Sequence, residues 1–352
     1  MASIQQDVAS YEKWLRKQCR VVEADLDAKH RRMCKSTFDF LRATHFRWAR
    51  TIEALCPSLA AAPQVLCIGD IHIENYGTWR DADARLVWGI NDFDEAAVMP
   101  YAFDLVRLAS SAVLAPDLEL PLADVATAIL SGYTSGLSSP RAVLLDEESG
   151  WLRSYVNPTA KSNRAFWQEL AGYPDAKPPD PVKRALKIAL PEGAKVQRFA
   201  SRSKGGGSLG RPRFLVIAAW NGGRVVREAK ALVPSAWAWA HQTSGRNRLL
   251  EAAFGAYRSP DPHLRCDAGF VLRRVAPDAR KIDVGDVRGN GLTEDLLAAM
   301  AVELAAVHAA GKKSKRIAED LQRRPAHWLQ EAVEVAKHAV ERDFAAYAAC
   351  EH

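Results

Sequence analysis

The stretch from Cys67 to Leu108 constrains the fold more than any other part of the chain. The apolar residues 65–68 end at Gly69, which predicts a buried strand that leads into a loop. Residues 76–79 and 85–90 resemble strands, and the polar turn between them predicts a hairpin. A helix is expected from Tyr101 to Ala115. A strand, a loop, a hairpin and a helix in close succession predict an α+β fold.

Polar side chains occur in this stretch in the order that a phosphoryl-transfer site needs. Asp70 follows the buried strand, so its carboxylate can orient a substrate hydroxyl and accept the proton. Asn75 ends the same loop and can offer an amide oxygen to Mg²⁺, which prefers oxygen ligands. Asp92 follows the hairpin as a second metal ligand, and Asp94 is the competing candidate. Any one of these residues alone is better explained as a turn cap, whereas the ordered set favours a catalytic loop and a metal site.

A glycine-rich segment and a lysine form the second group of candidates. Residues 205–210 read Gly-Gly-Gly-Ser-Leu-Gly, which fits G-x-G-x-x-G, but a strand follows where a dinucleotide fold needs a helix. A glycine loop between two strands covers the nucleotide phosphates in protein kinases, and a flexible surface loop is the alternative. The candidate ATP-binding residues of this loop are Gly205, Gly206, Gly207, Ser208 and Gly210.

Lys230 ends the strand that follows the tight turn at 221–223, so its ammonium group can reach the same phosphates. Glu251, on a helix predicted from Asn247 to Tyr257, is the candidate carboxylate that holds Lys230. Glu228 lies on the lysine's own strand face and is the alternative partner.

The chain divides into four predicted segments. Residues 1–60 form an N-terminal helical region, and residues 61–190 form the catalytic-loop and metal-binding segment with helices. Residues 191–285 form a β-rich nucleotide-binding lobe, and residues 286–352 form C-terminal helices that complete the helical lobe. Five prolines between 174 and 191 predict a linker or a boundary between lobes.

Composition excludes several classes of protein. The 352 residues are 48% hydrophobic and allow a full core, yet no stretch of about 18 apolar residues predicts a membrane span. The polar start does not resemble a signal peptide, and six scattered cysteines without a C-x-x-C pair indicate reduced thiols and a cytoplasmic location. The net charge is +6, but the basic residues are dispersed, which favours a solvated surface over a nucleic-acid interface. The oligomeric state stays open.

The motifs described above resemble those of the protein-kinase-like superfamily, particularly aminoglycoside and choline phosphotransferases. The matching elements are Gly69 to Asn75, Ile90 to Phe93, and Asp104-Leu105. The chain is still more similar to the bacterial family called domain of unknown function 2252, strongly over residues 29–115 and weakly over 200–310. That pattern includes Met33, Ser36, Phe40-Leu41-Arg42, the 69–75 loop, Ile90 to Glu95, and Phe103 to Ala109. The resemblance to the kinase-like superfamily implies ATP and Mg²⁺ as cofactors and a small-molecule hydroxyl as acceptor. The resemblance to the bacterial family names no substrate.

The order of the motifs differs from that of ordinary kinases, in which the glycine loop and lysine precede the catalytic loop. Here residues 205–230 follow residues 70–94, and residues 302–311 resemble the helix that leads into a catalytic loop. We therefore expect a two-lobed protein-kinase-like fold that is circularly permuted. By the same resemblance, Asp104 is a structural residue that steadies the catalytic loop from a helix.

Three other functions are compatible with the sequence. Asp70-x-His72 also opens metal-dependent phosphoesterase sites, which bind two metals, although the nine histidines of this chain do not group. Nucleotidyl transfer requires only that ATP bind the same fold in reverse. A non-catalytic nucleotide-binding regulator would use the same polar groups without turnover.

Overall fold

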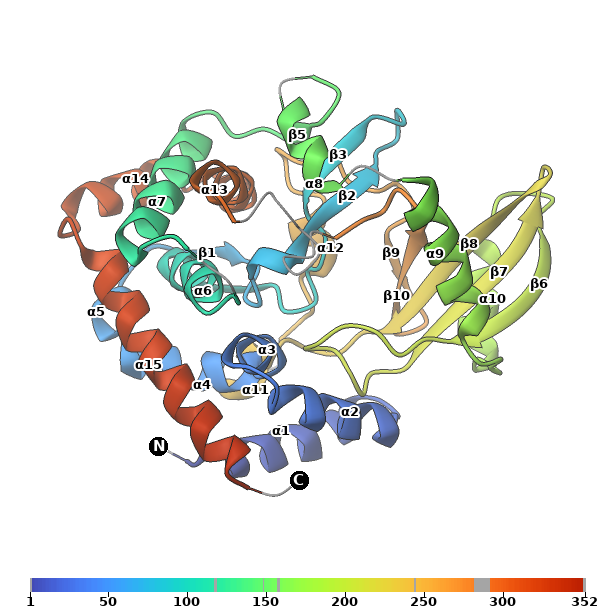
Figure 1. Ribbon diagram of the computed structural model, residues 1–352, viewed down its shortest axis with the longest axis horizontal. Coiled ribbons are helices and arrows are strands. Elements are labelled where there is room, and N and C mark those ends of the chain that lie inside the picture. Colours follow the sequence, from blue (N-terminus) through green and yellow to red (C-terminus); the bar gives the residue numbers. More distant parts are fainter. Residues whose placement is uncertain are drawn as a thin grey trace.

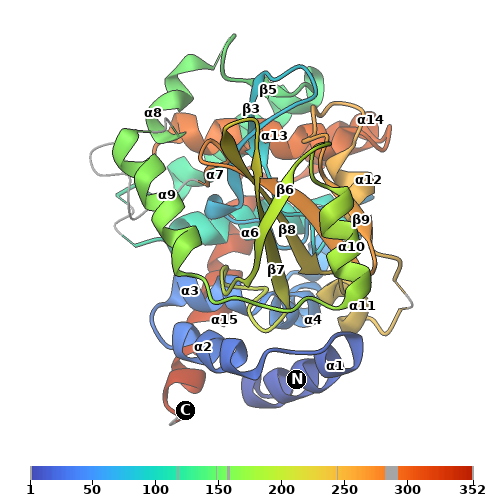
Figure 2. The same cartoon turned by 90° about the vertical axis from the view of Figure 1, so that its right-hand side faces the viewer.

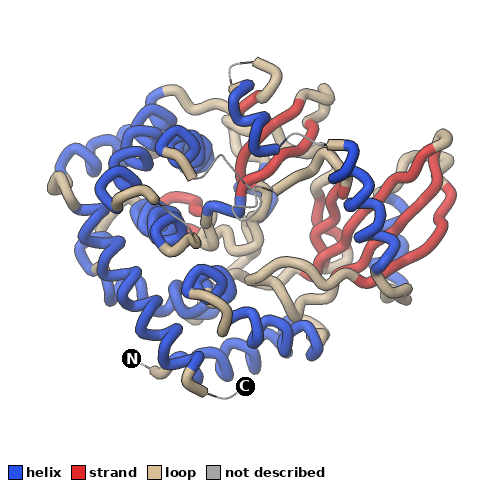
Figure 3. The backbone as a smooth tube through the Cα atoms, viewed as in Figure 1, coloured by secondary structure: helices blue, strands red, loops and turns tan. Residues whose placement is uncertain are grey.

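The computed structural model describes residues 2–116, 119–147, 149–156, 159–243, 245–281 and 292–350. A mainly helical part and a part built on an antiparallel sheet lie side by side (Figure 1). The tube drawing in Figure 3 shows the same division, with most helices on one side and the longest strands on the other. The mixture of helices and separate sheets confirms the α+β class.

The N-terminal region is helical, as predicted. Its helices are α1 (Ile4–Gln18), α2 (Glu23–Met33), α3 (Thr37–Ala43), α4 (His45–Leu55) and α5 (Pro57–Ala60). Ser3 and Gln6 form a capping box that starts α1, because each side chain accepts a backbone N–H that the helix leaves unpaired. Inside this region the ring of Tyr11 stacks on Phe46, with centroids 4.5 Å apart, in an apolar cluster of its own.

A second group of helices surrounds the largest core. It consists of α6 (Tyr101–Val113), α7 (Leu122–Ser138), α13 (Glu294–Ala309), α14 (Ser314–Arg323) and α15 (Trp328–Ala348). Helices α7 and α13 approach closely at Gly132, where a Cβ atom would lie 2.2 Å from the carbonyl oxygen of Ala298. Helix α6 is buried along nearly its whole length, which places its polar residues inside the molecule.

Two small sheets carry the polar stretch that the sequence singles out. Strand β1 (Gln64–Cys67) pairs antiparallel with β4 (Ala97–Pro100). Strands β2 (Tyr76–Arg80), β3 (Leu86–Ile90) and β5 (Val143–Leu144) form a three-stranded sheet. The predicted strand before Asp70 and the predicted hairpin after Asn75 are thus confirmed as β1 and as β2 with β3.

A five-stranded antiparallel sheet dominates the other part. Its order is β6 (Lys195–Ser201), β7 (Arg213–Trp220), β8 (Gly223–Ala231), β10 (Phe270–Val275) and β9 (Arg265–Asp267). Asn221 and Gly222 have φ values of 46° and 78°, which two-residue hairpin turns require, and they join β7 to β8 as predicted. Helices α9 (Ala160–Gly172) and α10 (Asp180–Ile188) flank this sheet (Figure 2).

Several local predictions need correction. The proline-rich segment 174–191 is more than a linker, because Pro181 lies in the first turn of α10, where a missing N–H costs nothing. The helix predicted over 247–257 shortens to α12 (Leu249–Ala253). Elements that were not predicted include α8 (Arg153–Val156), α11 (Ala236–Ala240), α14, β4, β5 and β9. The predicted boundary between 285 and 286 lies outside the described residues. None of the described helices is long and apolar enough to cross a membrane.

Candidate functional site

A cavity of about 860 Å³ is lined by residues of both parts of the molecule. The loop between β1 and β2 and the segment after β3 contribute Asp70, Asn75, Asp92 and Asp94, and the glycine loop contributes Gly205, Gly206, Gly207 and Ser208. Lys230 lines a small adjoining pocket that shares Asp92 and Asp94. The fold therefore brings together candidates from two segments that lie far apart in the sequence.

Helix α6 contacts the loop after β1 and holds its backbone in place. Gly69 has a φ of 77°, and a Cβ atom there would lie 2.5 Å from the carbonyl oxygen of Glu95, so only glycine fits. The buried carboxylate of Asp104 accepts the backbone N–H groups of Ile68 at 2.7 Å and Gly69 at 3.0 Å. These two bonds fix the start of the loop. Asp104 thus lies where a residue that steadies this loop from a helix is expected.

Asp70 is oriented by a buried arginine. The Nε and Nη2 atoms of Arg107, which is fully buried on α6, donate to Asp70 Oδ1 at 3.2 and 2.6 Å. The other carboxylate oxygen faces the glycine loop, because a Cβ atom on Gly207 would lie 3.1 Å from it. One oxygen is thus anchored while the other is presented to the cavity, an orientation in which a carboxylate can accept a proton from a hydroxyl group.

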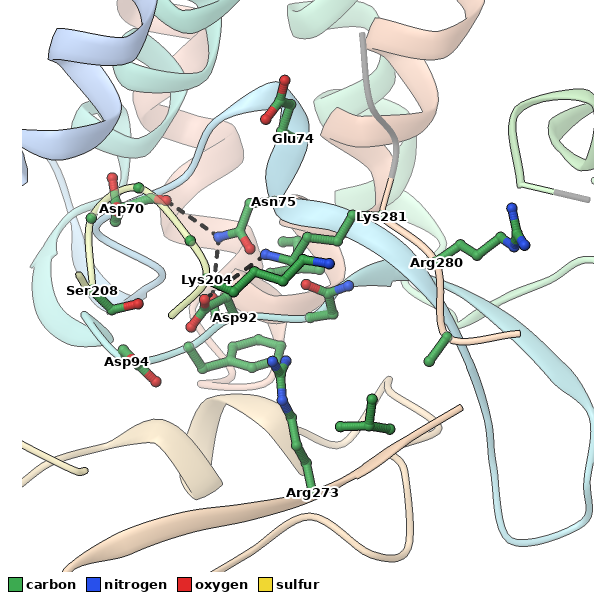
Figure 4. Close-up of a pocket in the computed structure, with 18 of the residues that line it drawn as sticks. Asp70, Glu74, Asn75, Asp92, Asp94, Lys204, Ser208, Arg273, Arg280 and Lys281 are labelled. Atoms are coloured by element: carbon green, nitrogen blue, oxygen red, sulfur yellow. Dashed lines mark hydrogen bonds and ion pairs between the residues drawn. The ribbon is translucent and has the colours of Figure 1, made fainter. Parts of the chain in front are cut away.

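Asn75 lies between Asp70 and Asp92 (Figure 4). Its amide nitrogen donates to the backbone carbonyl oxygens of Asp70 at 3.2 Å and Asp92 at 3.1 Å. Its Oδ1 atom is buried and has no hydrogen-bond partner among the described residues. A buried amide oxygen without a partner is costly, so this atom is suited to ligate a cation.

Asp92 is a second residue whose side-chain oxygens could hold a metal ion. Burial alone would raise the pKa of the Asp92 carboxyl, but the cations of Lys230 and Lys281 hold it well below its usual range. The group is therefore ionised at neutral pH. Figure 4 shows Lys281 extending toward Asp92, with 3.9 Å between Lys281 Nζ and Asp92 Oδ2. An unpaired amide oxygen and an ionised carboxylate on adjacent segments are the donor set that Mg²⁺ prefers beside phosphates.

Lys230 has different partners from those predicted. Its Nζ atom lies 3.2 Å from Asp92 Oδ1 and 2.5 Å from Asp94 Oδ2. Glu251, the predicted partner, is exposed and pairs at 2.9 Å with Arg248, the residue that precedes helix α12. The side chain of Glu251 extends from the short helix α12 into solvent and does not line the cavity. Glu251 therefore does not hold Lys230.

Glu228, the alternative partner of Lys230, is bound by three arginines. It is fully buried, and its neighbours are Arg202 at 2.6 Å, Arg273 at 2.7 Å and Arg213 at 3.6 Å. Burial would raise the pKa of this carboxyl, but the arginines hold it well below its usual range. The network fixes three guanidinium groups at the cavity wall, since all three arginines also line the cavity.

Asp94 forms an ion pair with Lys230 and is less available than Asp92 as a metal ligand. It is buried, and its Oδ2 atom also accepts from Arg211 Nη1 at 3.2 Å. The side chain of Asp92 is more exposed, at 28% against 8% for Asp94. Of the two candidates, Asp92 is therefore the more open to a metal ion.

The glycine loop packs against Asp70 and against helix α2. Gly205 and Gly210 have φ values of 99° and 93°, which favour glycine, and the hydroxyl of Ser208 accepts from Arg213. Gly210 does not reach the cavity. A Cβ atom there would lie 2.5 Å from Leu26 on α2, so this glycine is needed for packing against that helix.

The sequence did not reveal how many basic residues converge on the cavity. They are dispersed along the chain, yet many of them line this one space: Lys29, Arg32, Arg42, Arg202, Lys204, Arg211, Arg213, Arg258, Arg273, Arg274, Arg280 and Lys281. The local signals were the adjacent pairs Arg273-Arg274 and Arg280-Lys281. A cavity with so many cations favours an anionic ligand.

Among the described residues, the group that could hold a metal through His, Cys, Asp or Glu alone is Cys67, Asp104 and His308. It is fully buried, and the Nε2 atom of His308 already lies 3.1 Å from Asp104 Oδ2. The Asp70-x-His72 pair belongs to no such described group. Burial lowers the pKa of His72 well below its usual value, so this ring is neutral.

Comparison with known proteins relates part of the chain to a bacterial family. Residues 20–136 match a family described as an uncharacterized protein conserved in bacteria (DUF2252). The matched segment contains the 70–75 loop, Asp92 and Asp94, but not the glycine loop or Lys230. No curated protein and no solved structure shows significant similarity to the chain. The match supports the similarity to this bacterial family that the sequence motifs suggest, and the family description names no activity.

Proposed function

We propose that this protein is a magnesium-dependent ATP phosphotransferase with a kinase-like, circularly permuted arrangement. The observation that carries the proposal is the contact between Lys230 and Asp92, 138 residues apart, at 3.2 Å. It joins the predicted phosphate-binding lysine to the predicted metal ligand beside one cavity. The two segments come in the order opposite to that of ordinary kinases, but a site depends on spatial arrangement and not on chain order.

The five-stranded sheet supports the same proposal. The glycine loop lies between its first two strands, β6 and β7, and Lys230 lies on β8, the third strand in both chain order and sheet order. Protein kinases also place a glycine loop over the nucleotide phosphates and a lysine on the third strand. One detail differs from protein kinases. There the partner of the lysine is a glutamate on a helix, whereas here the two carboxylates near Lys230 are Asp92 and Asp94, from the segment after β3.

Each residue of the site then has a chemical role. Lys230 and the backbone of the glycine loop hold the phosphates, and Asn75 and Asp92 hold the metal ion. When bound, magnesium neutralises charge on the phosphates. Asp70 accepts the proton of the acceptor hydroxyl. At the same time the oxygen of that hydroxyl bonds to the γ-phosphorus of ATP, and the bond between the γ-phosphorus and ADP breaks. The acceptor is a small molecule that enters the cavity near Asp70.

Ligand-dependent stability tests the nucleotide site. A ligand that binds only the folded state stabilises it by about 2.7 kcal/mol at about 100 times Kd, which raises the melting temperature. We expect Mg²⁺ and ATP together to raise the melting temperature of the wild type, and Asp92→Ala to remove this shift. The matched control, Asp267→Ala, changes an exposed aspartate of β9 and should keep it. A folded wild type that responds to no nucleotide would refute the proposal.

Turnover distinguishes the proposed reaction from its alternatives. Asp70→Asn should bind Mg²⁺ and ATP like the wild type but lose transfer, since an amide cannot accept the proton although its oxygen can still accept from Arg107. ADP as the product indicates phosphoryl transfer, whereas AMP or pyrophosphate indicates nucleotidyl transfer. Stabilisation by a transition metal without nucleotide would favour a phosphoesterase. Binding without turnover in the wild type would favour a regulator.

A further inference from the structure

Lys29 is a buried lysine that no step above uses. It lies on α2, in the N-terminal helical region, and only 3% of the residue is exposed. Its ammonium group stands over the rings of Tyr11 and Phe46, at 5.7 and 5.5 Å from their centroids. Its hydrogen-bond acceptor is the carbonyl oxygen of Gly207, at 3.3 Å. Lys29 thus joins helix α2 to the glycine loop.

The ammonium group has more hydrogen-bonding capacity than the protein uses. It carries three N–H donors, and one of them bonds to Gly207. No described carboxylate forms a salt bridge with it, and the charged groups that face it are Glu12, Asp70, Glu95 and Arg211. Burial lowers the pKa of Lys29 to about 8, which leaves the group mostly charged at neutral pH. A buried charge without an ion-pair partner is costly, so a bound anion would stabilise it.

The position of Lys29 indicates where that anion would lie. Lys29 lines the large cavity, and its bonding partner Gly207 also lies against the free oxygen of Asp70. Lys230 lines the small adjoining pocket, where it pairs with Asp92 and Asp94. Lys29 therefore stands beside the proposed proton acceptor, at the end of the cavity where the acceptor molecule enters.

We propose that Lys29 is a phosphate-binding residue at the Asp70 end of the cavity. Two sources supply the same chemistry: the γ-phosphoryl group of ATP, or a phosphate carried by the acceptor molecule. The assignment of these sources rests on the proposed phosphotransferase function, whereas phosphate binding by Lys29 does not. The aromatic rings fix the ammonium group in place, so its contact to phosphate requires no rearrangement of a flexible side chain.

Calorimetric titrations of the full chain test this role. The variants are Lys29→Met, which removes the charge at similar volume, and Lys29→Arg, which keeps it. Lys35→Met is the matched control, because Lys35 is exposed just after the same helix. The probes are Mg²⁺–ATP, Mg²⁺–ADP, inorganic phosphate added to the ADP-loaded protein, and pyrophosphate alone.

Loss of a charge-assisted contact should weaken phosphate binding about tenfold or more. If Lys29 binds the γ-phosphoryl group, Lys29→Met loses affinity for ATP and keeps its affinity for ADP. If Lys29 binds a phosphate of the acceptor, both nucleotide affinities stay and inorganic phosphate no longer binds the ADP-loaded protein. Unchanged affinity of Lys29→Met for all four probes would overturn the inference while leaving the phosphotransferase proposal intact.

The pyrophosphate arm separates the two proposals in the other direction. Pyrophosphate binding that depends on Lys29, in a protein that binds no nucleotide, would support the inference and refute the phosphotransferase. A folded wild type that binds none of the four probes would refute both.

A pH series on the wild type keeps the inference testable even if Lys29→Met does not fold. Phosphate affinity should fall between about pH 7 and about pH 9.5 as Lys29 loses its proton, and Lys29→Arg should resist this fall because arginine stays charged. Equal pH profiles for the two proteins would overturn the inference.

Discussion

Two adjacent serines on α6 give a controlled test of how the loop at residues 69–75 is held. The hydroxyl of Ser111 accepts the backbone N–H of Ile73 at 3.0 Å and donates to the carbonyl oxygen of Leu108 at 2.7 Å. Ser110 is equally buried, but its hydroxyl has no hydrogen-bond partner among the described residues. Replacement by alanine removes the same single oxygen atom from each position. The difference between the two variants therefore reports the bond to the loop.

Ser111→Ala should cost about 1–3 kcal/mol of unfolding free energy, because the fully buried N–H of Ile73 loses its acceptor. Ser110→Ala should be neutral or slightly stabilising, because it removes a buried polar group that has no partner. The assay is urea unfolding, in which a shifted midpoint at unchanged slope reports a change in stability. Hydrogen exchange at the Ile73 amide, faster in Ser111→Ala alone, places the effect at the loop. Equal destabilisation by both substitutions, or a larger loss in Ser110→Ala, would refute the reasoning.

Three further predictions concern stability and use the same denaturation assay. Asp104→Asn should lose about 2–4 kcal/mol, because an amide cannot accept both loop N–H groups as the carboxylate does, and a loss below about 0.5 kcal/mol would contradict this. Gly132→Ala should cost about 1–3 kcal/mol, since its methyl group meets the backbone of Ala298, whereas Gly150→Ala meets nothing and should stay within about 0.5 kcal/mol. Equal effects of the two glycine substitutions would contradict that packing argument. The pKa of Lys29 is about 8 in the folded protein against about 10.4 when unfolded, so the unfolded chain binds more protons in that range. Wild-type stability should gain up to about 3 kcal/mol as pH rises through this window, and Lys29→Met should lack that gain and be the more stable protein at neutral pH.

Local sequence patterns were sufficient to predict the strands that flank the loop at residues 69–75. An apolar run that ends in glycine predicted β1, and alternating segments around a polar turn predicted the hairpin of β2 and β3. The Asn221-Gly222 turn predicted the β7–β8 hairpin because few residues other than asparagine and glycine tolerate positive φ. Each of these signals depends on residues that lie close together in the chain.

The partner of Lys230 could not be predicted in this way. Glu251 was chosen because a helix follows the lysine's strand, as in kinases, but that helix is short and directs the glutamate to solvent. The actual partners, Asp92 and Asp94, precede the lysine by more than a hundred residues. Pairing over such a distance is decided by how the two parts of the molecule pack, and no local pattern records it. The same limit applies to the cations of the cavity, which appeared dispersed because the chain separates what the fold gathers.

The charges around Asp92 bear on the order in which ligands enter the proposed site. Five cations surround its end of the cavity and face three carboxylates, namely Lys230, Lys281, Arg202, Arg213 and Arg273 against Asp92, Asp94 and Glu228. This positive surplus repels a free divalent cation, although the oxygens of Asn75 and Asp92 suit one. A nucleoside triphosphate reverses the balance because its phosphates carry the missing negative charge. We therefore expect Mg²⁺ alone to leave the melting temperature unchanged, ATP alone to raise it, and both together to raise it furthest. A shift with Mg²⁺ alone would mean that the carboxylates, and not the surrounding cations, dominate the potential at the site.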